Sequence, residues 1–107
     1  MTSAAAITPT IVQKTYVPST GMTGTPMRLV KYTFKLTKAA DSDWIVTNSY
    51  MQSGTPIYYN AVTIDSSSDG VQEGTVGMTY ETSGNKLILA GGTTGTTYGE
   101  VWFEEAA

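Results

Sequence analysis

The chain has 107 residues, of which 40% are hydrophobic and 14% are charged, and its net charge at pH 7 is -3. This length supports a single domain, because the residues left over could not build a second hydrophobic core. Cysteine and histidine are absent from the sequence, which excludes disulfides and thiolate metal clusters and removes the commonest general base. The acidic balance argues against a nucleic-acid partner, and no apolar run is long enough to cross a membrane as a helix.

The remaining composition favours β-structure. The sequence contains nineteen threonines, nine serines, eleven glycines and seven tyrosines. β-Branched and aromatic side chains pack well on a pleated sheet, and the few alanine-rich stretches are too short to nucleate a helix. An all-β fold is therefore expected.

The first eight residues have mostly small side chains and no alternating pattern. They are expected to form a flexible arm ahead of a single β-sandwich domain over residues 9–107. They also lack the basic and apolar regions of a secretory signal, so export by the general secretory route is not expected. An extended arm can add a strand to the open sheet edge of a neighbour. The candidate assembly arm consists of Met1, Thr2, Ser3, Ala4, Ala5, Ala6, Ile7 and Thr8.

The clearest strand covers residues 28–37, where Val30, Tyr32 and Phe34 alternate with polar side chains, as in a strand with one buried face. The same alternation occurs in residues 75–81 and 99–104. Four less regular stretches complete the roughly seven expected strands: residues 10–17, 44–47, 57–64 and 86–90.

Glycine and proline mark the turns between these strands. Ser83 and Gly84 lie where a tight hairpin turn would connect residues 75–81 to residues 86–90, and a glycine-rich segment follows. Residues 75–104 are therefore expected to form a three-stranded antiparallel meander. Short strands with turns about every eight to twelve residues predict an antiparallel β-sandwich or small barrel.

Charge is unevenly distributed along the chain. Five of the six basic residues precede residue 40, whereas all nine acidic residues follow it. One interpretation is that basic early strands pair with acidic late strands inside one sheet. The other is that the molecule has one positive and one negative surface, which would let copies of the chain meet head to tail.

No group of residues predicts catalysis. The close carboxylate pairs lie in serine-rich loops or in the last residues of the sequence, where solvation is expected rather than the apolar pocket that a glycosidase acid requires. Serine has no histidine to activate it, and no nucleophile elbow is present. Residues 65–70 resemble half of a calcium loop, but Val76 stands where a bidentate glutamate would be needed. We expect a protein that is not an enzyme and that holds no cofactor and no metal.

Aromatic side chains give the candidate binding residues. Trp102 faces outward if Val101 and Phe103 face the core. Tyr58 and Tyr59 are neighbours, so one of them must also face outward. Flat aromatic faces on a β-sandwich suit sugar rings, but outward tryptophan and tyrosine suit a protein contact equally well. The candidate protein or sugar contacts are Trp44, Tyr58, Tyr59 and Trp102.

Residues 28–37 and the C-terminal stretch over residues 74–104, which begins GTVGMTYETSGNKLILAGGTTG, share a style of short strands rich in threonine and glycine. In this the chain resembles the small all-β virion proteins of tailed bacteriophages and some archaeal viruses, in particular capsid decoration or cement proteins. About half of the chain carries the resemblance, which includes no diagnostic motif, so no functional residue is carried over.

The resemblance implies a viral structural protein that forms a symmetric homo-oligomer, often a trimer. Such an oligomer clamps subunits of a major capsid protein together and resists internal pressure. The implied location is the capsid surface of a virion, after synthesis in the host cytoplasm. The alternative function is a carbohydrate-binding or adhesion module that uses its exposed aromatic side chains.

Overall fold

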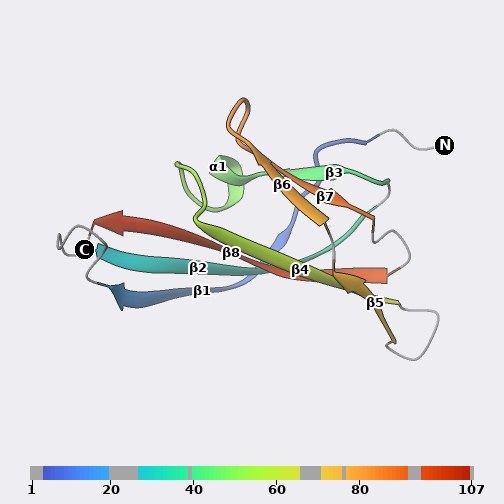
Figure 1. Ribbon diagram of the computed structural model, residues 1–107, viewed down its shortest axis with the longest axis horizontal. Helices are drawn as coiled ribbons and strands as arrows, with labels where there is room; N and C mark the ends of the chain where they lie inside the picture. The colour runs from blue at the N-terminus through green and yellow to red at the C-terminus, as the bar shows by residue number, and fades with distance from the viewer. Residues whose placement is uncertain are drawn as a thin grey trace.

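The computed structural model describes residues 4–19, 27–38, 40–65, 71–75, 77–91 and 95–106 (Figure 1). The expected all-β fold is confirmed, since these residues form eight strands and one single-turn helix. No helix in the described part of the chain is long and apolar enough to span a membrane. In chain order the elements are β1 (Thr10–Ser19), β2 (Met27–Thr37), β3 (Asp43–Val46), α1 (Thr47–Tyr50), β4 (Tyr58–Asp65), β5 (Val71–Thr75), β6 (Gly77–Glu81), β7 (Lys86–Ala90) and β8 (Gly95–Ala106).

A five-stranded antiparallel sheet in the order β1-β2-β8-β4-β5 forms the larger layer. Its central strands β2 and β8 are the longest, with 11 and 12 residues, and they pair from Met27 opposite Ala106 to Thr37 opposite Thr96. Side chains along both strands alternate between a buried and a more exposed face, as the pattern of residues 28–37 predicts. The buried face is called the inner face of this sheet and the opposite one its outer face.

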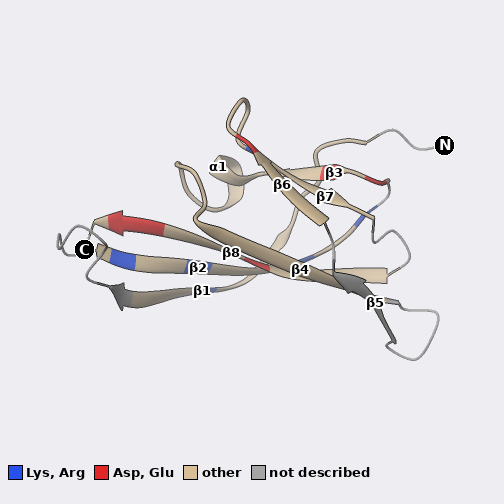
Figure 2. Ribbon diagram, in the orientation of Figure 1, with Lys and Arg blue, Asp and Glu red and all other residues tan. Residues whose placement is uncertain are grey.

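At the end of the large sheet near the C-terminus, a basic residue of β2 lies beside acidic residues of β8 (Figure 2). Arg28 pairs in register with Glu105, and the Arg28 Nε donates to Glu105 Oε1 over 2.6 Å. The first interpretation of the charge distribution is therefore supported, because an early basic strand pairs with a late acidic one. Both partners are partly exposed, so the ion pair stabilises the fold by about 1 kcal/mol at most.

β3, β7 and β6 form a second antiparallel sheet, in that order. β6 and β7 are joined by the hairpin turn that the sequence predicts at Ser83 and Gly84. Gly84 has a φ of 84°, which glycine adopts without a steric penalty, and Asn85 follows with a φ of 53°. The Asn85 N–H donates to the carbonyl of Thr82 over 3.3 Å and closes the turn.

The expected meander over residues 75–104 is wrong in its third strand. β7 pairs with β6 and β3, whereas β8 belongs to the five-stranded sheet and lies between β2 and β4. In that place both edges of β8 have hydrogen-bond partners, and Val101 and Phe103 are buried. The connection after β7 therefore joins two sheets rather than two neighbouring strands.

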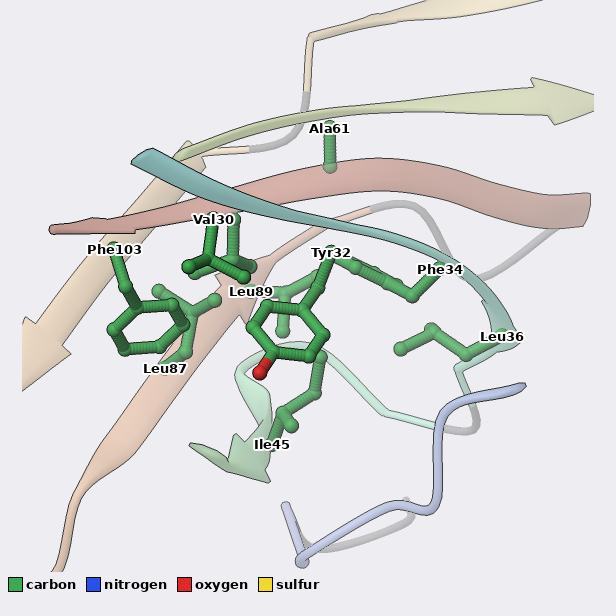
Figure 3. Packing of buried hydrophobic residues seen from close by; sticks show 10 residues of the cluster. Val30, Tyr32, Phe34, Leu36, Ile45, Ala61, Leu87, Leu89 and Phe103 are labelled. Atoms are coloured by element: carbon green, nitrogen blue, oxygen red, sulfur yellow. The ribbon is translucent and has the colours of Figure 1, made fainter. Parts of the chain in front are cut away.

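The two sheets enclose one hydrophobic core (Figure 3). Within it the rings of Tyr32 and Phe103 meet edge to face, with their centroids 5.7 Å apart and an angle of 89° between their planes. Such pairs add about 0.5–1.5 kcal/mol beyond the burial itself. The arrangement is sandwich-like, with β2, β4 and β8 on one side and β3 and β7 on the other. The buried cluster consists of Val30, Tyr32, Phe34, Leu36, Ile45, Ala61, Leu87, Leu89, Val101 and Phe103.

Two elements were not expected from the sequence. β5 pairs with the second half of β4 and is the additional strand. α1 replaces the end of the expected strand over residues 44–47, because the Met51 N–H donates to the Thr47 carbonyl over 2.8 Å and closes one helical turn. The Thr47 N–H donates to the Asn85 carbonyl over 3.0 Å, so the start of α1 is tied to the β6–β7 hairpin.

The three-stranded sheet covers only part of the inner face. Figure 1 shows that the ends of β1, β2 and β8 near the C-terminus extend beyond β3, β6 and β7. Tyr16 lies there with inner-face register opposite Val30, yet its side chain is 46% exposed. The molecule is correspondingly elongated, since its radius of gyration of 14.7 Å exceeds the value of about 13 Å typical of a compact domain of this length.

Candidate interaction surface

The outer face of the five-stranded sheet brings together two of the four candidate contact residues. Tyr58 on β4 lies directly opposite Trp102 on β8, so their side chains are cross-strand neighbours. On the other side of Trp102 lies Lys31 of β2, whose Nζ is 5.4 Å from the centroid of the tryptophan ring. Tyr58 is 53% exposed, and Trp102 is half-buried. These three residues, Lys31, Trp102 and Tyr58, form a row across three strands that we call the aromatic platform.

Strand alternation explains why Trp102 lies on this face. Val101 and Phe103 are fully buried on the inner face, so the residue between them must point outward. The carbonyl of Trp102 accepts the N–H of Ile57 over 2.8 Å. Its indole Nε1–H is shielded from solvent and donates to no atom of the described residues. The orientation of Trp102 that the sequence predicts is thus the one observed.

The other two candidate contacts lie elsewhere. Tyr59 is on the inner face and packs against the hydrophobic core. Trp44 is on β3, paired with Ile88 of β7, and the Lys86 Nζ lies 4.6 Å from the centroid of its ring. Its neighbour Ile45 is in the core, so Trp44 faces away from the core on the opposite side of the sandwich. The four candidate residues therefore do not form one site.

A pocket of about 360 Å³ lies on the outer face beyond the aromatic platform. Lys35 and Tyr98, which form part of its lining, pair with each other on β2 and β8. No single motif in the sequence indicates this site. Tyr98 could have been found by the argument that places Trp102, because the two residues are four positions apart on one strand and share a face. The residues that line the pocket are Thr8, Thr10, Lys35, Leu36, Thr37, Thr96 and Tyr98.

The described part of the candidate arm lies along β3. The Trp44 N–H donates to the carbonyl of Ala5 over 3.2 Å, and the Ile7 N–H donates to the carbonyl of Trp44 over 2.9 Å, which forms a parallel bridge at Ala6. Ile7 is partly buried and packs against the core. Residues 5–7 therefore have fixed partners within the molecule, and the role of residues 1–8 in assembly stays a prediction. Residues 1–3 lie outside the described residues.

Asp43 connects the arm to the rest of the chain. Its carboxylate is buried, with Oδ1 accepting the N–H of Ala5 over 2.9 Å and Oδ2 accepting the N–H of Ala40 over 3.0 Å. A buried carboxylate requires such donors, because its desolvation is otherwise costly. The Asp43 carboxylate thus links Ala5, in the candidate arm, to Ala40, which precedes β3.

Lys38 is the buried cation of the same region, with 2% of its surface exposed. Its Nζ donates to the carbonyl of Gly91. Burial lowers the pKa of Lys38 below 10.5, while the nearby carboxylates of Asp41 and Asp43 act in the opposite direction. The Asp41 Oδ1 accepts the N–H of Gly91 over 2.7 Å, and this bond is the main reason that the pKa of Asp41 is lowered below 3.8. Because Lys38 and Asp41 both bond the main chain at the end of β7, we assign them a structural role.

The described residues contain no group of three or more histidine, cysteine, aspartate or glutamate side chains that could hold a metal ion. Of residues 65–70, which resemble half of a calcium loop, residues 66–70 lie outside the described residues. The remaining acidic side chains of the outer face, Glu100 and Glu104, are spaced along β8 on the same side as Trp102. Asn60 donates to Glu100 Oε1 over 3.3 Å and to the hydroxyl of Tyr58 over 2.9 Å. These hydrogen bonds connect Asn60 to Tyr58 and Glu100 at the rim of the aromatic platform.

Comparison with known proteins gives no relative, since no protein-family model, no curated protein and no solved structure matches this chain.

Proposed function

We propose that the protein is a non-enzymatic structural protein of the capsid-decoration type, which binds a virion lattice through the outer face of its five-stranded sheet. The observation that carries this proposal is the aromatic platform. Tyrosine and tryptophan are the residue types enriched where protein contacts gain most of their binding energy. Here Tyr58 and Trp102 lie side by side on a sheet face, bordered by charges of both signs from Lys31 and Glu100.

Binding to a lattice suits a platform of this modest size. A single contact built on two aromatic side chains is weak, but many copies linked in one assembly gain effective concentration and hence avidity. The expected partners are therefore a major capsid or other virion protein and further copies of this chain. We place the contacts between copies at β1, an edge strand of the large sheet on which Val12 is 58% and Tyr16 is 46% exposed, because exposed apolar edge strands favour association.

Co-sedimentation tests the platform. The chain is mixed with capsids assembled from the major capsid protein encoded in the same genome, and the bound fraction is measured after centrifugation. The double variant Y58A/W102A should lower the affinity at least tenfold, since truncation of a hot-spot residue costs about 2 kcal/mol or more. The matched control is W44A, which removes a tryptophan from the opposite side of the sandwich and should leave capsid binding within about threefold of the wild type.

Three outcomes would contradict the proposal. The first is equal binding by wild type and Y58A/W102A. The second is a gene that lies in a genome without virion genes. The third is a monomer in light scattering on the purified wild type, where a trimer should give three times the 11.4 kDa of the single chain. Circular dichroism of both variants shows whether a loss of binding comes with a loss of fold.

A further inference from the structure

We propose that the pocket on the outer face binds an acidic sugar, meaning a hydroxylated ring that carries a carboxylate or a phosphate. This activity goes beyond attachment to a lattice and uses other residues than the aromatic platform. The volume of about 360 Å³ lies within the range of small-molecule sites, which starts at roughly 300 Å³. The side chains that offer chemistry to a ligand are Thr8, Thr10, Thr37, Thr96, Lys35 and Tyr98.

Strand register builds the floor of the pocket in two rows. Thr10, Lys35 and Tyr98 lie side by side on β1, β2 and β8, because Thr10 pairs with Lys35 and Lys35 pairs with Tyr98. Thr37 pairs with Thr96 in the next row on the same face. Neighbouring strands are about 4.8 Å apart, so the first row is about 10 Å across. A surface of this width accommodates one or two sugar rings.

The threonine hydroxyls supply paired hydrogen-bonding capacity. Each hydroxyl donates one bond and accepts others, which matches the hydroxyls of a sugar better than it matches a purely accepting or purely apolar ligand. Thr10 and Thr37 are exposed on the floor. The Thr8 hydroxyl lies 3.1 Å from the hydroxyl of Tyr50, which fixes the position of this side chain at the wall of the pocket.

Tyr98 supplies an apolar contact inside this polar lining. Its side chain is 45% exposed and stands at one end of the first row. The C–H face of a sugar ring can stack on the face of the tyrosine ring, because the aromatic face is flat and apolar. A pocket that combines a tyrosine ring with four hydroxyls therefore favours a sugar over a small inorganic ion.

Lys35 supplies the positive charge. It is exposed on β2, and within the part of the chain that the structure describes it forms no ion pair. No carboxylate lines the pocket, so the charge of Lys35 is available to a negatively charged ligand group. A charge-assisted hydrogen bond to such a group is about twice as strong as a neutral one. The same lining suits other ligand classes less well, because it offers a metal ion a lysine and no carboxylate, and it offers a nucleotide polyphosphate one cationic side chain.

Titration of the full chain, followed by two-dimensional ¹H–¹⁵N NMR, tests the proposal with four probes: glucuronate, glucose 6-phosphate, glucose and inorganic phosphate. Both acidic sugars should shift the amide signals of Thr37, Thr96 and Tyr98. Comparison of glucuronate with glucose 6-phosphate shows which acidic group the site prefers. Glucose should bind about tenfold to a hundredfold more weakly than the preferred acid, because it lacks the charge-assisted bond to Lys35.

Two variants sharpen the test. K35M should weaken the binding of the preferred acidic sugar about tenfold or more, and Y98A should weaken binding of both acidic sugars and glucose. The matched control is K86M, which removes a lysine from β7 in the other sheet, outside both the pocket lining and the aromatic platform. K86M should bind the acidic sugars as the wild type does. The amide spectrum outside the pocket reports whether each variant keeps its fold.

Several results would overturn the proposal. Inorganic phosphate that binds as tightly as the acidic sugars would show an anion site without sugar recognition. Glucose that binds as tightly would show that the charge of Lys35 does not contribute to binding. If none of the four probes shifted the amide signals of the pocket residues, the pocket would not be a binding site for these ligands. None of these results bears on capsid binding, which Y58A/W102A tests at separate residues.

Discussion

The hydroxyl oxygens of Thr63 and Thr97 lie 2.9 Å apart in the interior of the protein, where both side chains are fully buried. The two residues pair across β4 and β8, so the bond joins two strands of the large sheet on its inner face. T63V keeps the shape of the side chain but leaves the Thr97 hydroxyl without this partner. We expect T63V to lower the free energy of unfolding by about 1–3 kcal/mol, the cost of an unsatisfied buried polar group.

The double variant T63V/T97V is the control for this prediction. It removes both hydroxyls, so no polar group of the pair is left unsatisfied, and replacement of both partners by apolar groups is close to neutral. Urea unfolding curves should therefore show that the double variant is more stable than T63V alone. The assignment of this hydrogen bond would be contradicted if the double variant lost as much stability as T63V and T97V lose when their separate losses are added.

Local alternation made several features predictable from the sequence. The pattern around Val30, Tyr32 and Phe34 gives the buried face of β2, and the neighbours of Trp102 give its outward orientation. The β6–β7 hairpin follows from Ser83 and Gly84. In each case the signal lies within a few consecutive residues, because a strand alternates its faces with a period of two.

The partner of each strand could not be predicted in the same way. β8 follows β7 in the chain but lies between β2 and β4, and this choice depends on which long strands can satisfy both of its edges. The pocket at Lys35 and Tyr98 depends on the same long-range register. The buried Lys38 has no local signal either, since its acceptor is the carbonyl of Gly91, more than fifty positions away in the sequence.

Gly99 lies at the closest approach between β8 and the core. A Cβ atom at this position would lie 2.5 Å from Phe34 Cζ, 2.8 Å from the carbonyl oxygen of Asn60 and 2.9 Å from Ala61 Cβ. Phe34 is fully buried and the carbonyl is main chain, so neither can move freely. We expect G99A to lower the free energy of unfolding by about 1–3 kcal/mol, as overpacking does in other cores.

G77A is the matched control for G99A. At Gly77 the nearest atom to a new Cβ is Ala90 Cβ at 3.6 Å, an ordinary contact. Alanine also restricts the unfolded chain, so G77A should be neutral or more stable by up to about 1 kcal/mol. Thermal unfolding should separate the two variants by several degrees, since 1 kcal/mol corresponds to about 4–8 °C in a domain of this size. Equal midpoints would show that the backbone near Gly99 adapts to the extra methyl group.

Asp41 makes stability depend on pH. The N–H of Gly91 donates to its carboxylate and lowers its pKa in the folded state below the value of 3.8. A carboxyl group with a depressed folded-state pKa stabilises the protein above its unfolded-state pKa, and this contribution is lost as the pH falls through the folded-state pKa. D41N should therefore be less stable than the wild type at neutral pH, and the difference should shrink below about pH 4. Urea unfolding at a series of pH values measures this, and a difference that stays constant down to about pH 2 would contradict it.

Deletion of residues 1–8 tests the role of the candidate arm. All ten residues of the buried cluster lie between Val30 and Phe103, so the truncated chain should fold into the same two sheets. It loses the two main-chain bonds to Trp44, the bond from the Ala5 N–H to the buried Asp43 carboxylate and the partly buried side chain of Ile7. We expect its free energy of unfolding to fall by roughly 1–4 kcal/mol. If the arm joins neighbouring copies or capsid subunits, the folded truncated chain should no longer co-sediment with capsids.

Tryptophan fluorescence and the variant I7A separate these effects. The chain has two tryptophans, so in a W102F background the emission reports Trp44 alone, and deletion of the segment beside it should shift that emission to longer wavelength. I7A keeps the main-chain bonds to Trp44 while it removes the apolar contact, so it should lose stability but retain capsid binding. A truncated chain that is folded and still binds capsids would refute the arm as an assembly element. A truncated chain that fails to fold would instead make residues 1–8 part of the domain, because the bonds of Ala5 and Ile7 to β3 would then be required for the three-stranded sheet to form.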